Sequence, residues 1–535
     1  MSDAAPEAQQ QAQPASQSSG RSSALIGAGI LLSRLLGLAR QKLIAHYLGA
    51  GLVAAAFNGA FRLTNFLQNL FGEGVLSASF IPVYANALAR GDEEEADRIA
   101  GAIGAILGLV VLVVVAVGIA AAPLVVQLIV GGFEGEQLAL TIRLTRVLFP
   151  GAGLFVMGAW CLGILNSHRK FFLSYAAPVV WSLAMIVALF AYGPRSGQVE
   201  LAVIVSWASV VGALLALVVQ LPTVFKLLGH PRFRIDYAFP PVRQAVRNFG
   251  PVFASRGVVQ VSGFVDIWLA SPNADVGAVA LLANAQTIYL LPISLFGMSV
   301  SAAELPEMSR DTGSGEAAFE RLRTRLNAAL PRVAFFVVPS AVGFLVLGGA
   351  IVSVLLEGGR FTRTDSVRTW AILAGSAVGL VASSLGRLYS STFYALRDTR
   401  TPFWFALARV ALTGVLGYLF AFPLPRALGL APWTGAAGLT ASAGIAGWLE
   451  FLLLRRSISA RIGPTGVGLR TLAKLWGASL VAGAAGWGLT QLASALPHTA
   501  RGVAAIATFA VVYGAVTLAL GVPEARALVG RVRRR

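Results

Sequence analysis

The chain has 535 residues, of which 56% are hydrophobic and only 12% are charged, and its mean hydropathy is +0.73. Soluble domains carry roughly 25% charged residues, so this composition excludes a soluble enzyme and predicts an integral membrane protein. The net charge of +18 does not indicate nucleic-acid binding, because the basic residues fall between apolar segments rather than on one face.

Residues 1–22 are rich in Ala, Gln, Pro and Ser, which predicts a disordered cytoplasmic tail. About fourteen apolar segments follow, each long enough to cross a bilayer about 30 Å thick. A basic cytoplasmic tail, 523–535, ends the chain. The predicted fold is all-α and polytopic, with segments at about 24–46, 55–88, 99–130, 139–166, 171–192, 200–225, 243–270, 276–305, 327–356, 368–395, 402–422, 434–455, 471–494 and 502–522.

The distribution of basic residues predicts the orientation of these segments. With the N-terminal tail in the cytoplasm, about 27 Lys and Arg fall on the cytoplasmic side and about 6 on the other, as the positive-inside rule requires. An even number of segments then places both termini in the cytoplasm. We expect a multi-pass protein of the cell membrane.

Sequence motifs for catalysis or metal binding do not stand out. Cys161 is the only cysteine, and the four histidines are scattered along the chain. There is no Gly-rich phosphate loop and no nucleophile paired with a base. We therefore expect neither an enzyme nor a bound cofactor or metal.

Several charged residues fall within the apolar segments, where each costs roughly 2.5 to 3.5 kcal/mol at mid-bilayer unless it faces a polar cavity or a partner. We interpret Arg34, Arg40 and Arg62 as cavity residues, and we expect residues near helix ends, such as Arg143 and Arg387, to extend toward the interface. Basic residues outnumber acidic ones, which favours a transporter for an anionic, phosphate-bearing substrate. The basic residues are Arg34, Arg40, Lys42, Arg62, Arg143, Arg146, Arg256, Arg387 and Arg409, and the acidic ones are Glu73, Asp266, Glu304 and Glu450.

Several sequence blocks carry a family resemblance. They include SRLLGLAR from Ser33, AFRLTNFLQNLFGEG from Ala60, LNSHRKF from Leu165, YLLPISLFG from Tyr289 and FYALRDTRTP from Phe393. This pattern resembles the MurJ (MviN) family of lipid II flippases, within the multidrug/oligosaccharidyl-lipid/polysaccharide exporter superfamily. The resemblance covers about residues 24–525.

The resemblance implies two six-helix lobes, 24–225 and 243–456, around a central cavity, followed by a helix pair, 471–522. It implies a bacterial inner-membrane protein that moves undecaprenyl-pyrophosphate-linked peptidoglycan precursor to the outer leaflet by alternating access. Lipid II or a related polyprenyl-pyrophosphate glycolipid is the implied partner, with membrane lipids and cell-wall synthesis proteins as further partners and no nucleic acid. The polyprenyl tail would lie in a groove between helices.

By matching position, the resemblance also implies site residues. Arg34, Arg40 and Arg62 would attract the phosphates, and Asp266 would belong to the same cavity. Asn65 would line this cavity or form a helix–helix hydrogen bond. Glu73 would lock a gate or stabilise a helix bend.

The sequence departs from the family pattern in several places. Ala55 stands where an acidic residue is usual, and Gln68 and Thr287 replace arginines, whereas Arg256 and Arg409 are additional. Three interpretations remain open: Arg256 and Arg409 compensate, the substrate is another polyprenyl-linked oligosaccharide, or the protein is a non-transporting envelope-assembly scaffold. A cation at Arg409 would oppose sodium binding near Asp266, so we favour membrane potential over sodium as the driving force.

Overall fold

The computed structural model describes residues 17–71, 75–76, 79–168, 170–229, 231–271, 277–310, 315–493 and 495–533. Its regular elements within these ranges are helices. Their bounds are α1 Gln17–Leu48, α2 Leu52–Phe71, α4 Ile81–Ala89, α5 Glu93–Ala120, α6 Ala122–Ile129, α7 Gly135–Ser167, α8 Phe171–Tyr192, α9 Gln198–Leu227, α10 Pro240–Ala270, α11 Ala278–Pro292, η1 Ile293–Met298, α12 Ser299–Arg310, α13 Glu316–Val346, α14 Gly348–Leu356, α15 Arg363–Ala395, α16 Arg400–Ala421, α17 Pro423–Ala427, α18 Thr434–Ile462, α19 Leu469–Leu492, α20 His498–Ala519 and α21 Pro523–Arg533.

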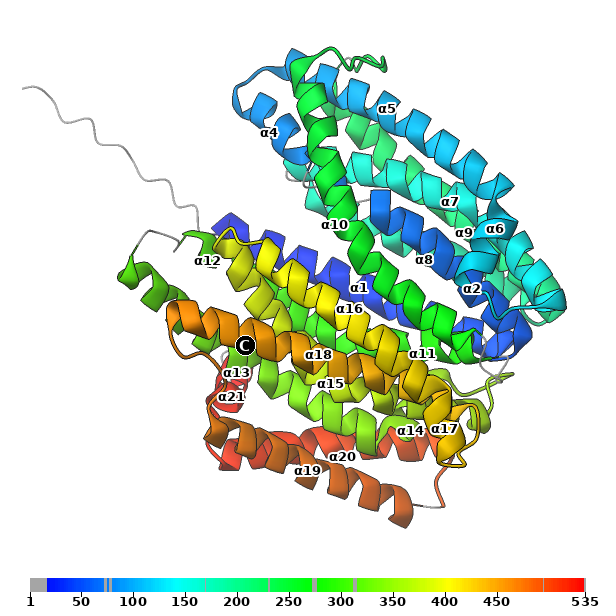
Figure 1. Ribbon diagram of the computed structural model, residues 1–535, viewed down its shortest axis with the longest axis vertical. Helices are drawn as coiled ribbons and strands as arrows, with labels where there is room; N and C mark the ends of the chain where they lie inside the picture. Colours follow the sequence, from blue (N-terminus) through cyan, green and yellow to red (C-terminus); the bar gives the residue numbers. More distant parts are fainter. Residues whose placement is uncertain are drawn as a thin grey trace, which may run out of the picture.

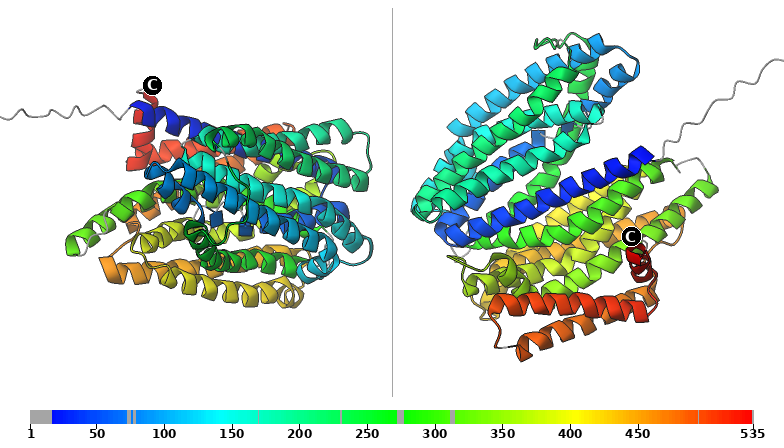
Figure 2. Two further views of the ribbon diagram at one scale, coloured as in Figure 1. Left: turned by 90° about the horizontal axis from the view of Figure 1, so that it is seen from above. Right: turned by 180° about the vertical axis from the view of Figure 1, so that it is seen from behind.

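The helices form two bundles that diverge from one end of the molecule (Figures 1 and 2). The N-terminal bundle contains α1 to α9, and the C-terminal bundle contains α11 to α18. Helix α10 runs between them and contacts α2 and α5 on one side and α16 and α18 on the other. Helices α19 and α20 pack on the outside of the C-terminal bundle, against α13 and α14.

Nine helices in the described ranges are long and apolar enough to cross a membrane. The predicted all-α polytopic fold is therefore confirmed. The total of fourteen crossings and the bounds of the lobes 24–225 and 243–456 and of the pair 471–522 remain predictions.

Helices extend into both predicted tails. Helix α1 begins at Gln17, inside the segment 1–22, because backbone hydrogen bonding continues past the apolar stretch into the polar residues before it. Residues 523–533 form helix α21, since Pro523 suits the first helical position and the Ala, Arg and Leu residues after it favour helix.

Within the described residues, four predicted segments contain more than one helix. Segment 276–305 contains α11, η1 and the beginning of α12. Segment 55–88 contains α2 and α4, segment 99–130 contains α5 and α6, and segment 327–356 contains α13 and α14. Helix α6 begins at Ala122 with Pro123 in its first turn. Proline is tolerated there because backbone N–H groups in the first turn have no partner within the helix. Apolar patterning alone does not reveal such breaks, because both halves remain apolar.

Small residues allow the helices of the C-terminal bundle to pack closely. A Cβ atom added to Gly379 of α15 would lie 2.5 Å from the Cα atom of Gly444 of α18. Membrane helices commonly associate through such small-residue contacts, because lipid provides no hydrophobic driving force between them. Helices α15 and α18 therefore pack at close distance beside the charged residues described below.

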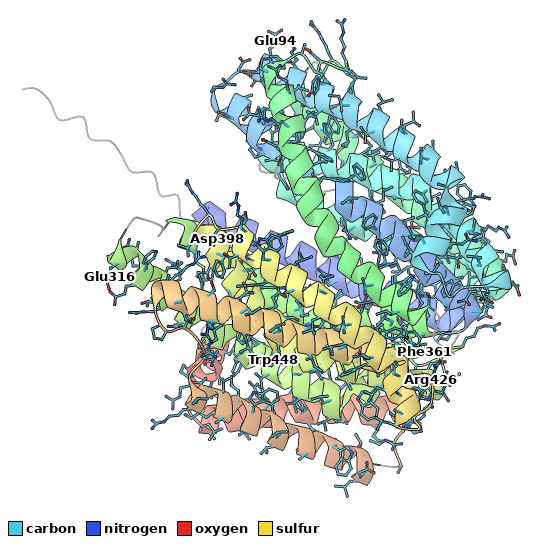
Figure 3. The ribbon with its side chains drawn as sticks, viewed as in Figure 1. Glu94, Glu316, Phe361, Asp398, Arg426 and Trp448 are labelled. Atoms are coloured by element: carbon cyan, nitrogen blue, oxygen red, sulfur yellow. The ribbon has the colours of Figure 1, made fainter. Side chains whose placement is uncertain are left out.

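The two bundles are joined by hydrogen bonds at the end of the molecule where α1 ends. The backbone N–H of Arg360 donates to the carbonyl of His46 over 2.8 Å, and Gln41 Nε2 donates to Asn284 Oδ1 over 2.6 Å. We call this the closed end; Figure 3 labels Phe361 near it. At the opposite end the bundles diverge, and Figure 3 labels Glu94, Glu316 and Asp398 there.

Candidate functional site

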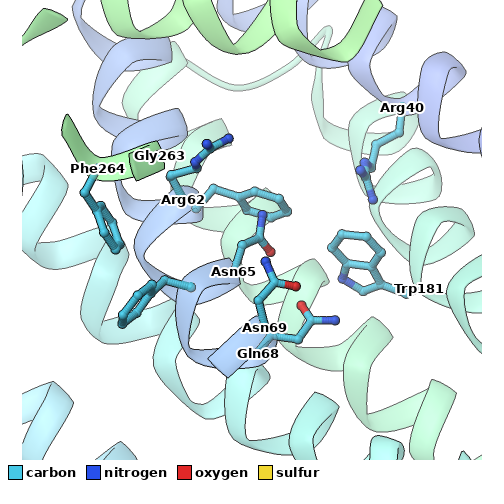
Figure 4. Close-up of a pocket in the computed structure, with 10 residues that line it drawn as sticks. Arg40, Arg62, Asn65, Gln68, Asn69, Trp181, Gly263 and Phe264 are labelled. Atoms are coloured by element: carbon cyan, nitrogen blue, oxygen red, sulfur yellow. The ribbon is translucent and has the colours of Figure 1, made fainter. Parts of the chain in front are cut away.

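A polar pocket of about 410 Å³ lies on the face of the N-terminal bundle beside α10 (Figure 4). Helices α1, α2, α8 and α10 contribute its walls. Figure 4 shows Arg40 and Trp181 on one side and Arg62 and Gly263 on the other. The lining residues are Arg40, Phe61, Arg62, Asn65, Phe66, Gln68, Asn69, Trp181, Gly263 and Phe264.

Helix α2 supplies most of this pocket from one of its faces. Residues 61, 62, 65, 66, 68 and 69 recur at the three- and four-residue spacing that places side chains on one side of a helix. The opposite side carries small apolar residues such as Ala56 and Ala60, which are fully buried in the bundle. Packing of that side therefore turns the polar residues toward the pocket.

Arg40 is held by an aromatic ring rather than by an acid. Its guanidinium carbon lies 4.1 Å from the centre of the Trp181 ring, and Nη1 donates to Ser182 Oγ over 3.4 Å. Its Nε atom is buried and forms no hydrogen bond in the structure. Arg40 therefore keeps both a positive charge and donor capacity for an incoming anion.

Arg62 extends toward the C-terminal bundle. Its Nη1 atom donates to Gln286 Oε1 of α11 over 2.9 Å. Gly263 of α10 makes room for this side chain, since a Cβ atom there would lie 2.8 Å from Arg62 Nη2. The Arg62 side chain thus connects α2 of one bundle with α11 of the other.

A second group of charges lies next to Arg62. Asp266, one turn after Gly263 on α10, interacts electrostatically with both Arg62 and Arg409, and its Oδ1 atom is buried without a hydrogen bond in the structure. Arg409 Nη1 forms an ion pair with Glu450 Oε2 at 3.1 Å. The extra cation of α16 is therefore partly neutralised by α18.

Arg387 of α15 also belongs to this second group. It interacts electrostatically with Tyr289, Arg409 and Glu450. The sequence places it near a helix end, where we expected it to extend toward the interface. Its prediction as an interfacial residue stays untested.

The predicted site residues fall into three sets. Arg40, Arg62 and Asn65 line the pocket, and Asp266 and Arg409 lie in the neighbouring charged group. Arg34 is exposed on α1 and does not line the pocket, whereas Glu73 and the side chain of Arg256 lie outside the described residues.

The residues that depart from the family pattern also have defined positions. Gln68 lines the pocket, so a polar but neutral group stands where the resemblance places a cation. Ala55 is fully buried in the bundle. Thr287 uses its hydroxyl to donate to the Ala283 carbonyl of its own helix.

Sequence reasoning missed several residues of the site. Asn69 follows Gln68 on the polar face of α2, so the helical spacing of polar residues in 61–69 could have identified it. Trp181 and Gly263 come from α8 and α10 and give no local signal, because their role depends on which helices pack together.

The pocket has the electrostatic character of an anion site. Among the described residues, its lining contains two arginines and three side-chain amides but no carboxylate. Arginine presents a planar fork of donors that matches phosphate oxygens, and amide groups satisfy further polar atoms. These arginines and amides therefore favour a ligand that carries phosphate and further hydrogen-bonding groups.

Residues 44–500 match the family model described as "Lipid II flippase MurJ". A relative from Rhizobium meliloti (strain 1021), "Probable lipid II flippase MurJ", is 32% identical over 81% of this chain and 79% of its own. "Lipid II flippase MurJ" of Burkholderia cenocepacia is 29% identical over 84% of this chain and 86% of its own.

Solved structures share the fold. "Lipid II flippase MurJ, inward closed conformation" aligns with a TM-score of 0.77 and 24% identity, over 94% of this chain and 99% of that one. An inward-facing multidrug resistance transporter of the MATE family aligns with a TM-score of 0.64 and 20% identity, over 80% and 95% of the two chains. The match over most of the sequence, together with this fold, shows that the chain is a multi-span membrane protein and belongs to the MurJ family.

Proposed function

We propose that this protein is a lipid II flippase, which moves the undecaprenyl-pyrophosphate-linked peptidoglycan precursor from the cytoplasmic to the outer leaflet by alternating access. The observation that carries the proposal is the pocket in which Arg40 and Arg62 stand beside the amides of Asn65, Gln68 and Asn69. Family membership supports the same substrate, because the matching family model is that of lipid II flippases.

The pocket supplies what a pyrophosphate loses when it leaves water. Transfer of a charged group into hydrocarbon without compensation is prohibitive, so the head group crosses only where protein groups replace its hydration. In our proposal Arg40 and Arg62 hold the phosphates, and the three amides hydrogen-bond the sugar and peptide groups. Gln68 lowers the charge of the pocket but retains its hydrogen-bonding capacity.

The diverging end of the molecule is the proposed entrance. The positive-inside rule places this end in the cytoplasm, together with both termini, in a bacterial inner membrane. Arg34 lies on α1 six residues closer to this end than Arg40, which is roughly 9 Å along the helix. It would attract the head group electrostatically before the head group reaches the pocket.

An apolar groove of about 520 Å³ is the proposed site for the polyprenyl tail. It lies between α11, α13, α14 and α20 of the C-terminal half. Its aromatic wall includes Phe296 and Phe336, whose rings stack with centres 4.2 Å apart, and Phe509. A flexible hydrocarbon chain suits this lining, because it buries apolar surface and requires no hydrogen bonds.

Membrane potential is the proposed driving force. Arg62 and Arg409 both interact electrostatically with Asp266, so a bound Na⁺ would compete with two guanidinium groups for this carboxylate. A charge that moves across the membrane gains about 2.3 kcal/mol per 100 mV. Collapse of the potential at a constant sodium gradient should stop transport, whereas removal of the sodium gradient alone should not.

Rescue of a bacterium depleted of its own lipid II flippase tests the proposal. Cells that express this protein should grow and should expose lipid II on the outer leaflet, as measured by a chemical probe that cannot cross the membrane. The variant Arg40→Gln with Arg62→Gln, expressed at the same level, should do neither.

The outcome separates the alternatives. Failure of the wild-type protein despite good membrane expression would contradict lipid II transport. Bound lipids extracted from the purified protein would then identify another polyprenyl-linked oligosaccharide. Co-purified cell-wall synthesis proteins without such a lipid would instead indicate a scaffold.

A further inference from the structure

A second pocket, of about 570 Å³, lies at the closed end of the N-terminal bundle, away from the site described above. Val53 of α2 and Val199, Val203 and Ile204 of α9 form its apolar walls. Arg143 of α7 and Glu200 of α9 supply its two charges. Neither charge has a role in the proposed transport site.

The two charges share the pocket without neutralising each other. Arg143 and Glu200 are both exposed, and neither takes part in an ion pair or side-chain hydrogen bond that the structure shows. Gln198, in contrast, is fixed by a 2.8 Å hydrogen bond from Nε2 to the Leu48 carbonyl. Within the part of the chain that the structure describes, the pocket therefore presents one unpaired cation and one unpaired anion to a ligand.

The packing of α7 against α9 sets the relative levels of the Cα atoms of Arg143 and Glu200 along the bundle. A Cβ atom on Gly151 of α7 would lie 3.4 Å from the Cα atom of Val210 of α9, so these residues are level with each other. Arg143 precedes Gly151 by eight residues and Glu200 precedes Val210 by ten, which at 1.5 Å per residue is about 12 Å and about 15 Å. The Cα atom of Glu200 therefore lies about 3 Å farther than that of Arg143 from the level of Gly151 and Val210.

The pocket continues onto a surface that faces lipid. Val199, Trp207 and Val211 of α9 are exposed at helical spacing, and the side chain of Trp207 is 53% exposed. A water-facing position would be unfavourable for such an apolar stripe, which is typical of a lipid-facing helix surface. A lipid head group in the adjacent leaflet can therefore reach the two charges from the membrane.

We propose that this pocket binds the head group of a zwitterionic phospholipid with a primary amine, such as phosphatidylethanolamine. The phosphate of such a lipid lies next to the glycerol, and the ammonium lies farther out. The Cα atoms follow the same order, and the two side chains supply a cation for the phosphate and an anion for the ammonium. A primary ammonium donates hydrogen bonds to a carboxylate, which a choline group cannot do, and a phosphatidylglycerol head group has no positive charge for Glu200.

Native mass spectrometry of the delipidated full-length protein tests the proposal. Phosphatidylethanolamine, phosphatidylcholine and phosphatidylglycerol with identical acyl chains are titrated separately. Wild-type protein should bind phosphatidylethanolamine most tightly. Arg143→Gln and Glu200→Gln should each weaken this binding by at least about fivefold, since each removes one charge-assisted hydrogen bond.

Arg146→Gln is the matched control. Arg146 lies on the same helix, its Nε atom donates to the Ile119 carbonyl, and it does not line the pocket. This variant should bind phosphatidylethanolamine as the wild type does. In Glu200→Gln, the preference for phosphatidylethanolamine over phosphatidylcholine should disappear.

Two results would overturn the proposal. One is wild-type affinity for phosphatidylethanolamine in both Arg143→Gln and Glu200→Gln. The other is tighter binding of phosphatidylglycerol than of phosphatidylethanolamine by the wild type, which would indicate a simple anion site at Arg143. Lipid binding is measured here without transport, so either result leaves the flippase proposal unaffected.

Discussion

Replacement of Arg40 by glutamine should weaken lipid II binding strongly while leaving the fold intact. Among the described residues, the guanidinium makes one 3.4 Å hydrogen bond, to Ser182, and lies 4.1 Å from the centre of the Trp181 ring and 5.9 Å from that of the Phe61 ring. Such ring contacts contribute about 0.5 kcal/mol when exposed and about 2 kcal/mol when desolvated, which is less than the total stability of a folded protein, so the fold should remain intact. A charge-assisted hydrogen bond to phosphate contributes about 1.5 to 3 kcal/mol, and its loss corresponds to a roughly 10- to 150-fold increase in Kd.

The assay is the Kd of purified protein for lipid II, measured together with the melting temperature. Arg40→Lys keeps the charge but loses the planar donor fork, so its Kd should lie between those of the wild type and Arg40→Gln. Arg426→Gln removes an exposed arginine of α17 outside the pocket and should leave the Kd unchanged. Wild-type affinity in Arg40→Gln would show that Arg40 does not bind the head group.

Three further predictions concern the rest of the molecule. Arg409→Asn should lower the melting temperature and abolish transport, because Glu450, only 17% exposed, loses its 3.1 Å ion pair. The double variant Arg409→Asn with Glu450→Gln should regain stability but not transport. A single variant as stable as the wild type would refute the role of the pair. Gly359→Ala should separate the bundles at the closed end, because Gly359 has a φ of +57° and contacts His46, and electron-spin distance measurements across this end should report the separation. Partial desolvation disfavours the charged form of Asp398, but hydrogen bonds from Thr401 and the Arg461 guanidinium outweigh it and lower the pKa of Asp398 to about 2. Since this folded-state pKa lies below the ordinary value, the ionised carboxylate should stabilise the protein above about pH 4, and the difference in melting temperature between the wild type and Asp398→Asn should shrink as the pH falls from 4 toward 2.

The fold class could be predicted from sequence because hydrophobic length alone identifies membrane helices. Helix breaks could not, since the residues on both sides of Ala121 and Leu347 are equally apolar. The helical start of the N-terminal segment was also missed, because polar residues extend a helix wherever its backbone bonds can continue.

Arg40 and Arg62 were predicted as cavity residues because charged groups within apolar segments need a polar environment, and Asn65 was predicted from the family resemblance; all three line the pocket. Their partners were not predicted. Trp181 and Gln286 look like ordinary helix residues until α8 and α11 are packed beside α1 and α2. Arg409 and Glu450 were both noted as charges in apolar stretches, but their pairing depends on the contact between α16 and α18.

Transbilayer movement of lipid II by the purified protein in liposomes tests the central claim most directly. With a membrane potential applied, the wild-type protein should move lipid II between leaflets, and the variant that combines Arg40→Gln with Arg62→Gln should not. Equal movement by the two proteins would contradict the assignment of the pocket. No movement by the wild type, under conditions in which another lipid II flippase is active, would contradict the proposed function itself.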